Sequence, residues 1–450
     1  MFDLVITNGN IIDPIDGEYQ KNIGVKDGKI VEISDKMLYG KEEIRVEDKK
    51  VAPGFIDIHM HEDELIKGVI KHNIFNYMAL MGVTTTVGGN CGLGCINIKE
   101  YLNIFDKQGA PVNYAGLIGN AKLREYIGCD DRYRPAKKDE IKKMGEIIKE
   151  GLQDGALGLS FGLEYTPGVS TEEFMELSKI VAEYPEKMVA CHYRFDAIRS
   201  LEALAEMIIV ARETKVKFEI SHIGSCIAFG QMKEGLKMLD AAVNSGIKIM
   251  ADLYPYNAFA TYIGTAVFDP GCFERWGVGY DAIQIADGKY SGQRCNKEIF
   301  DYLRENEPNT MAIAFVMNDD EVSEAMKNSH IMIGSDGLMA NGLGHPRGVG
   351  TFPRVLGKYV RQEHVIDLIT AINKMTNMPA QRLGLKSKGR IKEGYDADIT
   401  IFDYEKVIDN ATFEKPNIVS SGIEYVIVNG VKTVVNGNLT GSKPGISIKF

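Results

Sequence analysis

The chain has 450 residues, of which 44% are hydrophobic and 25% are charged, the balance of an ordinary globular protein. That length is too great for one small core, so we expect one large barrel-type domain with an accessory domain, or two to three ordinary domains. The formal net charge of -10 argues against nucleic acid as a partner, because phosphate binding needs a basic patch.

Both ends of the chain alternate apolar and polar residues. The first fifty residues contain "FDLVITNGNIID" and "NIGVKDGKIVEIS", and the last sixty contain "YDADITIFDY" and "IEYVIVNGVKTVVNG". Period-two hydrophobicity broken by Asn-Gly or Asp-Gly is typical of β-hairpins. Each end is too small to fold alone. We therefore predict one small β-sandwich domain built from 1–52 and 386–450.

The region 53–385 instead repeats a buried strand, a loop and a helix. Eight such units fit a (β/α)8 TIM-like barrel of the α/β class, whose strands read as continuous apolar runs. A doubly wound open sheet is the rival, but it usually carries a glycine-rich phosphate loop after its first strand, where this chain has histidines. The stretch 257–310 is too long for a simple loop and predicts a lid-like insertion. The predicted strands are 54–61, 84–92, 112–119, 155–163, 187–194, 215–223, 248–256 and 330–337.

The first predicted barrel strand ends in two histidines, in "GFIDIHMHEDEL". Residues i and i+2 of a strand share a face, so His59 and His61 project together. At the carboxyl end of a barrel strand that face looks into the mouth where active sites lie. Two imidazoles there suit a divalent metal such as zinc. The alternative is a pair of partly buried histidines bonded to backbone carbonyls.

Other predicted strands end in the same kinds of residue. Cys91 ends the second, His192 the fifth, His222 the sixth and Asp336 the eighth. Together with His59 and His61, four of the eight histidines of the chain thus lie at strand ends. Cysteine and histidine favour zinc over magnesium or calcium. A metal-bound water is acidic enough to react near neutral pH, and Asp336 can both ligate the metal and accept its proton. This set predicts metal-assisted hydrolysis of an amide-type bond.

Over nearly its whole length the sequence resembles the amidohydrolase superfamily, and its motifs are similar to those of the D-aminoacylase branch, the N-acyl-D-amino-acid deacylases. The motifs follow one another in the expected order: "GFIDIHMHEDE", "GVTTTVGGNCG", "GALGLSFGLEYTPG", "HYRFD", "EISHIG", "DLYPY", "IGSDG", "HPRGVGTFPRVLGKYVR" and, near the end, "KGRIKEGYDADITIFD" and "TGSKPG". The resemblance implies a zinc-dependent hydrolase that cleaves N-acyl-D-amino acids to a carboxylate and a free D-amino acid.

The resemblance also implies a role for each of these side chains. Cys91, His192 and His222 would ligate the tighter metal ion. His59, His61 and Asp336 would surround a second, weaker position, with Cys91 as the bridge and one or two zinc ions bound. Many amidohydrolases bridge two metals with a carboxylated lysine on the fourth strand, whereas "GALGLSFGL" has none. Asp336 would be the catalytic acid and base.

Four further residues are expected to bind substrate. Tyr165, Arg194, His345 and Arg347 lie in or beside the family motifs, and an arginine can hold a carboxylate by two hydrogen bonds. Plain structural roles for Tyr165 and for the glycine-rich loop of His345 and Arg347 remain open. The branch commonly has a lysine two residues after the sixth-strand histidine, where this chain has Gly224. Arg194 and Arg354 are candidate replacements.

The remaining candidates have ordinary structural explanations. We expect His72, His330 and His364 to be surface or capping residues, and Glu62 and Asp63 to orient the imidazoles. The seven cysteines do not suggest a disulfide framework, and no segment reaches the roughly 20 apolar residues of a membrane span. The start, "MFDLVITNGN", lacks a basic region ahead of a long apolar stretch, so we do not expect it to be a signal peptide. We therefore expect a cytoplasmic protein with reduced thiols, without a membrane or nucleic-acid partner. The cysteines other than Cys91 are expected to be small buried apolar residues.

Two alternatives to linear amide hydrolysis stay open. One is opening of a cyclic amide, as dihydroorotase or hydantoinase relatives do, against which the missing fourth-strand lysine counts. The other is a non-catalytic scaffold that kept the barrel and lost its metal, against which the full set of ligand-type residues counts. The substrate is expected to be a small molecule, an N-acyl amino acid, and homo-oligomerisation is left open.

Overall fold

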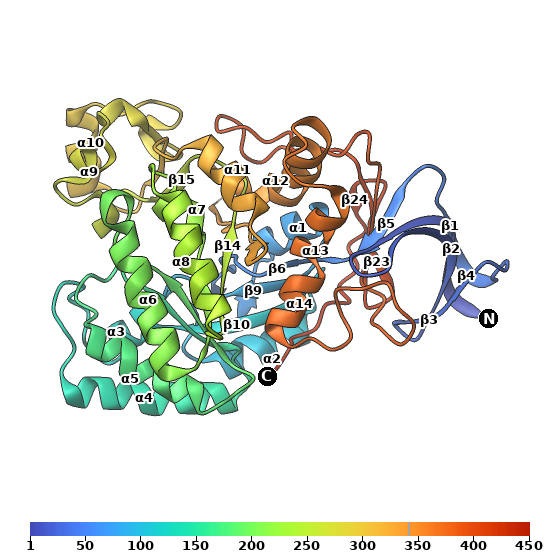
Figure 1. The fold of residues 1–450 in the computed structure, drawn as a ribbon, viewed down its shortest axis with the longest axis horizontal. Coiled ribbons are helices and arrows are strands. Elements are labelled where there is room, and N and C mark those ends of the chain that lie inside the picture. The colour runs from blue at the N-terminus through green and yellow to red at the C-terminus, as the bar shows by residue number, and fades with distance from the viewer. Residues whose placement is uncertain (341–342) are drawn as a thin grey trace.

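The computed structural model describes residues 1–340 and 343–450 of the chain. Its centre is an eight-stranded parallel sheet in the order β18-β14-β13-β12-β11-β10-β9-β6 (Figure 1). These strands are β6 (Phe55–Asp57), β9 (Val83–Gly88), β10 (Asn113–Gly119), β11 (Gly158–Gly162), β12 (Met188–His192), β13 (Lys217–Ile220), β14 (Ile249–Leu253) and β18 (Ile331–Ile333).

The sheet curls until its two edge strands meet just beyond their carboxyl ends. Met60 forms a parallel bridge with Gly337. The backbone N–H of His61 donates to the Gly337 carbonyl at 3.0 Å, and that of Asp336 donates to the His59 carbonyl at 2.7 Å. The result is a nearly closed parallel barrel, which confirms the predicted fold class.

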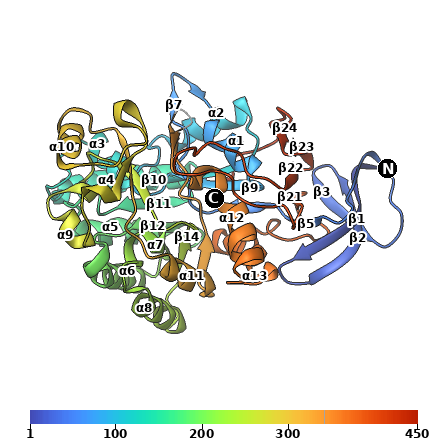
Figure 2. The ribbon, with the colours of Figure 1, turned by 90° about the horizontal axis from the view of Figure 1, so that it is seen from above.

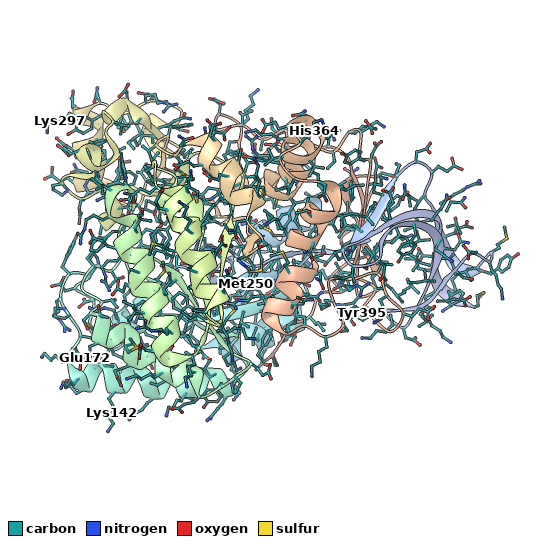
Figure 3. The ribbon with its side chains drawn as sticks, viewed as in Figure 1. Lys142, Glu172, Met250, Lys297, His364 and Tyr395 are labelled. Atoms are coloured by element: carbon teal, nitrogen blue, oxygen red, sulfur yellow. The ribbon has the colours of Figure 1, made fainter. Side chains whose placement is uncertain are left out.

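Helices cover the outside of the barrel and bury apolar side chains against it. In α4, Ile141, Met144 and Ile148 are buried, while Lys142 on the same helix points to solvent (Figure 3). The barrel-side helices are α1 (Asn73–Leu80), α2 (Ile98–Gln108), α3 (Asn120–Tyr126), α4 (Lys138–Gln153), α5 (Thr171–Ala182), α6 (Ser200–Thr214), α7 (Ile223–Ile227), α8 (Met232–Asn244), α11 (Asp319–Lys327), α12 (Arg347–Arg354), the π-helix Val355–Gln362, α13 (Leu368–Met375) and α14 (Asn377–Leu383).

Strands from both ends of the chain join one nine-stranded sheet. The link is the antiparallel pairing of β5 with β21. The ion pair of buried Asp13 with half-buried Arg390, at 2.7 Å, links the two segments again. The strands are β1 (Phe2–Asp13), β2 (Gly17–Lys26), β3 (Lys29–Ser34), β4 (Gly40–Arg45), β5 (Lys50–Pro53), β21 (Ile399–Phe402), β22 (Ile423–Val428), β23 (Val431–Val435) and β24 (Asn438–Leu439).

Not all of the C-terminal segment joins this sheet. Residues 445–450 run against the barrel, where Tyr114 on β10 donates to the Ile446 carbonyl at 3.1 Å and accepts from the Ile448 N–H at 2.7 Å. The division into domains 1–52 with 386–450 and 53–385 stays a prediction.

The stretch 257–310 folds as a small unit at the far end of the molecule from β1–β4 (Figures 1 and 2). It supplies β15 (Phe259–Tyr262), β16 (Ile283–Ile285), α9 (Cys272–Trp276) and α10 (Lys297–Asn306), and it pairs with β17 (Met311–Ala314) in an antiparallel sheet. Two hairpins, β7 (Leu65–Ile66) with β8 (Val69–Ile70) and β19 (Met339–Ala340) with β20 (Leu343–Gly344), lie near the carboxyl ends of the barrel strands. Among the described helices, none is both long and apolar enough to cross a membrane.

Candidate metal centre and active site

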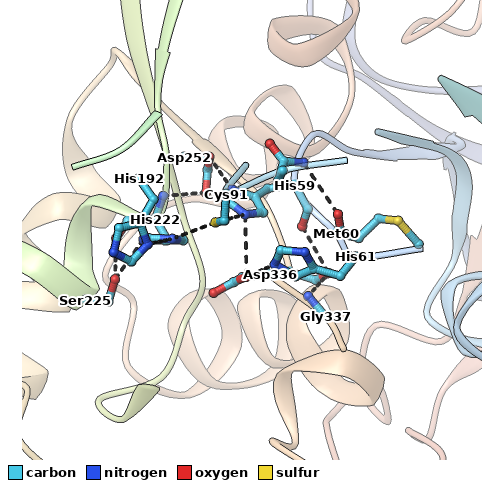
Figure 4. A network of polar contacts seen from close by, with 12 residues as sticks. His59, Met60, His61, Cys91, His192, His222, Ser225, Asp252, Asp336 and Gly337 are labelled. Carbon is cyan, nitrogen blue, oxygen red and sulfur yellow. Dashed lines mark hydrogen bonds and ion pairs between the residues drawn. The ribbon is translucent and has the colours of Figure 1, made fainter. Parts of the chain in front are cut away.

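The six ligand-type side chains converge at the carboxyl ends of the barrel strands (Figure 4). Their ligand atoms form two overlapping groups in which all atoms lie within 4.8 Å of one another. One group contains Cys91, His192 and His222, and the other contains His59, His61, Cys91 and Asp336. Cys91 belongs to both, and Figure 4 shows its sulfur between the two sets of imidazoles.

The ligand atoms of the cluster lie close enough together to share one cation. Cys91 Sγ lies 3.4 Å from His222 Nε2 and 3.5 Å from His59 Nε2. His192 Nδ1 lies 3.0 Å from His222 Nε2. His61 Nε2 lies 2.9 Å from Asp336 Oδ1.

Three polar groups decide which ring nitrogens face this centre. Asp252 Oδ2 accepts from His59 Nδ1 at 3.0 Å, and Glu164 Oε2 accepts from His192 Nε2 at 3.0 Å. Ser225 donates its hydroxyl to the His222 carbonyl and can thus accept from His222 Nδ1 at 2.8 Å. Because each outer nitrogen then carries the proton, each inner nitrogen presents a lone pair to the centre.

These facing lone pairs are the test of whether the residues fit a metal. Two acceptor nitrogens 3.0 Å apart repel unless a proton or a metal ion lies between them. One thiolate and several imidazoles form the ligand set that zinc prefers, with an aspartate for a second ion. The cluster therefore fits zinc.

Three residues of the cluster have a left-handed backbone. The φ angles of Cys91, His222 and Asp336 are 54°, 34° and 48°. For residues other than glycine this conformation costs on the order of 1–3 kcal/mol, and it gathers at functional sites. Neighbouring strands hold it in place: Asp252 Oδ1 accepts from the His222 N–H at 2.8 Å, and the His59 carbonyl accepts from the Asp336 N–H.

The charges of the cluster keep its anionic groups ionised. Burial alone would raise the pKa of the Cys91 thiol, but without a metal ion the positive charge of protonated His222 and His59 outweighs it and holds that pKa well below its ordinary value. Burial would likewise raise the pKa of Asp336, but Arg347 and the imidazoles hold it well below its usual range. Both side chains are thus available as anionic ligands.

A cavity of about 1280 Å³ lies over this cluster. His61, Cys91 and Asp336 line its floor, and Tyr165 and Arg347 line its wall. Ala260, Thr261, Tyr262 and Thr265 of the inserted segment also line it. A small molecule in this cavity would contact the cluster directly.

Comparison with known proteins identifies the family. A model of the amidohydrolase family matches residues 42–290 and 302–434. This chain belongs to the amidohydrolase family. The D-aminoacylase of Alcaligenes xylosoxydans xylosoxydans is 31% identical over 475 aligned residues, which cover 99% of this chain and 97% of that protein.

Two crystal structures align with 100% of this amidohydrolase and 100% of their own chains. A D-aminoacylase matches with a TM-score of 0.90 and 32% identity. An N-acyl-D-glutamate deacylase from Bordetella bronchiseptica, complexed with zinc and a phosphonate that mimics the tetrahedral intermediate, matches with a TM-score of 0.89 and 28% identity. These matches confirm the resemblance to the D-aminoacylase branch.

Of the residues expected to bind substrate, some line the cavity and others are bonded within the fold. Tyr165 lies beside the cluster, with its ring centroid 4.5 Å from that of His192. Arg347 forms an ion pair with Asp336 at 2.9 Å and lies over the ring of Tyr254. The buried Nε of Arg347 has no hydrogen-bond partner among the described residues. Both line the cavity of this amidohydrolase.

His345 and the other two arginines are instead engaged in the fold. His345 is buried, donates from Nε2 to the Ala258 carbonyl at 3.0 Å and accepts from the Arg347 N–H at 3.0 Å, so it positions Arg347. Arg194 pairs with Glu206 at 2.9 Å and bonds the Val169 carbonyl at 2.7 Å.

Arg354 pairs with Asp409 at 2.9 Å and bonds the Pro255 carbonyl at 2.7 Å. The geometry therefore does not favour direct contact between the substrate and His345, Arg194 or Arg354.

Several minor expectations also need correction. Glu62 accepts from the Gly89 N–H at 2.5 Å and Asp63 from the Ile74 N–H at 3.0 Å, so these carboxylates bind backbone amides and not the imidazoles. His72, expected to be a surface or capping residue, is buried and occupies the N-cap position of α1 without a side-chain capping bond.

Sequence reasoning missed Asp252 and Glu164 as orienting groups. The one available signal was an acidic residue inside the apolar strand "KIMADLYPY", since carboxylates are almost never buried without a partner.

Proposed function

We propose that this amidohydrolase is a zinc-dependent deacylase that cleaves the linear amide bond of N-acyl-D-amino acids to a carboxylate and a free D-amino acid. The observation that carries the proposal is the placement of Cys91 in two ligand groups at the floor of one cavity, with Asp336 and Arg347 beside it. The zinc-bound deacylase that aligns with the whole chain supports the same chemistry.

Cys91, His192 and His222 are the proposed ligands of the tighter zinc ion. His59, His61 and Asp336 are the proposed surroundings of a second position, with Cys91 shared between them. When bound, zinc supplies the positive charge that polarises the acyl carbonyl and makes water more acidic. Glu164, Asp252 and Ser225 hold the imidazoles in the tautomers that this binding needs.

The protein side chains then handle one proton. As water attacks the acyl carbon, Asp336 Oδ1, the oxygen that faces His61, takes the proton. As the carbon–nitrogen bond breaks, Asp336 returns that proton to the leaving nitrogen, which departs as the amine of the D-amino acid. Arg347 offers its unpaired Nε–H to the substrate carboxylate, and Tyr165 orients the acyl group.

Two broader features belong to the same proposal. The substrate is a small-molecule N-acyl amino acid, and the seven free thiols support a reducing, cytoplasmic location. Cell fractionation tests the location, and light scattering of the purified protein tests whether it forms a homo-oligomer.

Matched pairs of N-acetyl-D- and N-acetyl-L-amino acids test the activity. The zinc-loaded protein should release free amine from the D member of each pair, and Asp336→Asn should lower that rate by about 10²–10⁴-fold, the usual worth of acid–base catalysis. Hydrolysis of the L members alone would refute the stereochemical assignment. Hydrolysis of dihydroorotate or hydantoins, with linear amides untouched, would favour the less supported cyclic amide alternative.

A further inference from the structure

A buried carboxylate joins a proposed metal ligand to the inserted segment. Glu164 follows β11 and is 8% exposed. Its Oε2 accepts from His192 Nε2 at 3.0 Å, while its Oε1 lies 3.4 Å from the NH2 nitrogen of Arg275. Arg275 belongs to α9, a short helix of the insertion, 111 residues further along the chain. One side chain thus spans the space between the cluster and the insertion.

Arg275 is held in place by a second carboxylate. Its Nε lies 2.5 Å from Asp196 Oδ1, and the neighbouring Trp276 indole donates to Asp196 Oδ2 at 2.6 Å. Arg275 also donates to the Val267 carbonyl at 2.9 Å, within the insertion. The α9 helix is therefore fastened to the barrel at Asp196 and Glu164 together.

The charges explain why the contact matters. Asp196 is 2% exposed and shares a water-poor space with Glu164, so two negative groups lie close together. Burial and the charge of Glu164 raise the pKa of Asp196 to about 7. Arg275 contacts both carboxylates and compensates them. Without its guanidinium, Glu164 would be drawn toward other donors or solvent, and the His192 ring would lose its fixed partner.

We propose that Arg275, acting through Glu164, is a positioning residue of the metal centre, and that it couples the inserted segment 257–310 to metal affinity. This inference rests on the proposed ligand role of His192. When α9 is packed against the barrel, Arg275 holds Glu164 on His192 Nε2, and His192 Nδ1 therefore faces the centre. When α9 moves away from the barrel, Glu164 loses Arg275 and His192 loses its fixed hydrogen-bond partner.

Coupling of this kind acts in both directions. If opening the insertion weakens metal binding by a given factor, metal binding must make opening rarer by the same factor. Groups that orient a metal-bound histidine are typically worth about 10–100-fold in metal affinity. Hydrogen exchange at α9 should therefore slow by about 10-fold or more when zinc is bound.

The insertion offers a matched control. Arg304 on α10 pairs with Asp269 at 2.9 Å and bonds the Ile263 carbonyl at 2.9 Å, and its side chain is 23% exposed against 25% for Arg275. Both arginines thus fasten the insertion with an ion pair and a backbone bond. Of these two arginines, Arg275 contacts Glu164, whereas the ion pair of Arg304 lies within the insertion, with Asp269.

The experiment measures zinc affinity by competition with a chromophoric chelator for the full chain and four variants. We expect Arg275→Met and Glu164→Gln to weaken zinc binding by about 10–100-fold, Arg275→Lys to recover part of the loss, and Arg304→Met to stay within about 3-fold of the wild type. Glu164→Gln keeps the shape of the side chain, so it reports on the contact even if Arg275→Met folds poorly.

Hydrogen exchange of residues 272–276, with and without zinc, supplies the second measurement. Protection on zinc binding in the wild type and its loss in Arg275→Met support the coupling. Equal loss of affinity in Arg304→Met and Arg275→Met would overturn it, because any loosening of the insertion would then suffice. So would wild-type affinity in both Arg275→Met and Glu164→Gln. A wild-type chain that binds no zinc would instead overturn the proposed metal centre itself.

Discussion

Replacing Asp252 with asparagine should force a ligand histidine into the wrong tautomer. Asp252 accepts two hydrogen bonds, from His59 Nδ1 at 3.0 Å and from the His222 backbone N–H at 2.8 Å. An asparagine has one acceptor oxygen and one donor group. If the oxygen stays on the His222 N–H, the amide NH₂ faces His59, which must then accept at Nδ1 and carry its proton on Nε2. That proton points at Cys91, where a ligand lone pair is needed.

The other orientation of the amide is no better. With the oxygen turned to His59, the NH₂ opposes the His222 N–H in a buried space. An unsatisfied buried donor costs about 1–3 kcal/mol, and here it also removes the bond that holds His222 at a φ of 34°. One to 3 kcal/mol corresponds to roughly 5–150-fold in an equilibrium constant, since about 1.4 kcal/mol is tenfold. We therefore expect Asp252→Asn to weaken zinc binding by about 10–100-fold.

Isothermal titration with zinc and ¹⁵N spectra of the histidine rings measure the two halves of this prediction. The spectra of the wild-type zinc protein should show His59 protonated at Nδ1, and those of Asp252→Asn should show the Nε2 tautomer or an unbound ring. Asp398→Asn is the control, because that buried carboxylate binds Asn429 and Lys388 near the terminal sheet and bonds no imidazole among the described residues. Unchanged zinc affinity in Asp252→Asn, with the Nδ1 tautomer kept, would refute the assigned role.

Three further predictions concern substrate binding, the buried ion pair of Arg382 with Glu219, and the pH dependence of stability. Arg347→Met should lower kcat/KM for N-acyl-D-amino acids by about 10–100-fold, the worth of a charge-assisted hydrogen bond, and should act far less on N-acyl amines without a carboxylate. Arg382→Met leaves the buried Glu219 without the cation 3.1 Å away, so the free energy of unfolding in urea should fall by about 3–5 kcal/mol and recover when Glu219→Leu is added.

Burial lowers the pKa of Lys374 from 10.5 to about 8. Between pH 8 and 10.5 the unfolded chain holds a proton on this lysine that the folded chain has released. The free energy of unfolding should therefore increase as the pH rises through that window, by about 3 kcal/mol at most. Urea midpoints across that window should show a smaller rise in Lys374→Met than in the wild type, and an unchanged rise would contradict the assignment.

The sequence predicted those site residues whose position can be inferred from a single strand, without knowledge of its neighbours. Alternation within a strand places His59 and His61 on one face, and the rule that barrel sites lie at carboxyl ends brings Cys91, His192 and His222 to the same mouth. These inferences need no knowledge of which strand lies beside which. They were sufficient for the barrel and for all six cluster residues.

The same rule does not hold for every residue beyond a strand end. Five of the six cluster residues lie two to four residues past their strands and still face the mouth of the barrel. Arg194 lies two residues past the end of β12 and turns to Glu206 on α6 instead. His345 lies near Arg347 in sequence, yet its ring bonds the Ala258 carbonyl and leaves the cavity to its neighbour. Closeness to a motif does not fix the direction of a side chain beyond regular structure.

Contacts between distant segments were out of reach for a different reason. Asp252 meets His59 across 193 residues, and Arg275 meets Glu164 across 111. No periodic pattern encodes such pairs. The inserted sheet was equally hidden, because its strands are three or four residues long and β17 lies outside the predicted stretch.

The cluster combines features that are each unfavourable in a metal-free protein. Three of its residues have left-handed backbones, inner ring nitrogens face one another, and the anions Cys91, Asp336, Asp252 and Glu164 lie in or around it. Strain and like-charge repulsion of this kind persist only where something compensates them. A divalent cation held by Cys91 and the imidazoles would use the facing lone pairs as ligands and would offset the negative charge. Zinc binding should therefore stabilise the fold as well as enable the reaction, by about 2.7 kcal/mol at a free concentration of 100 times Kd.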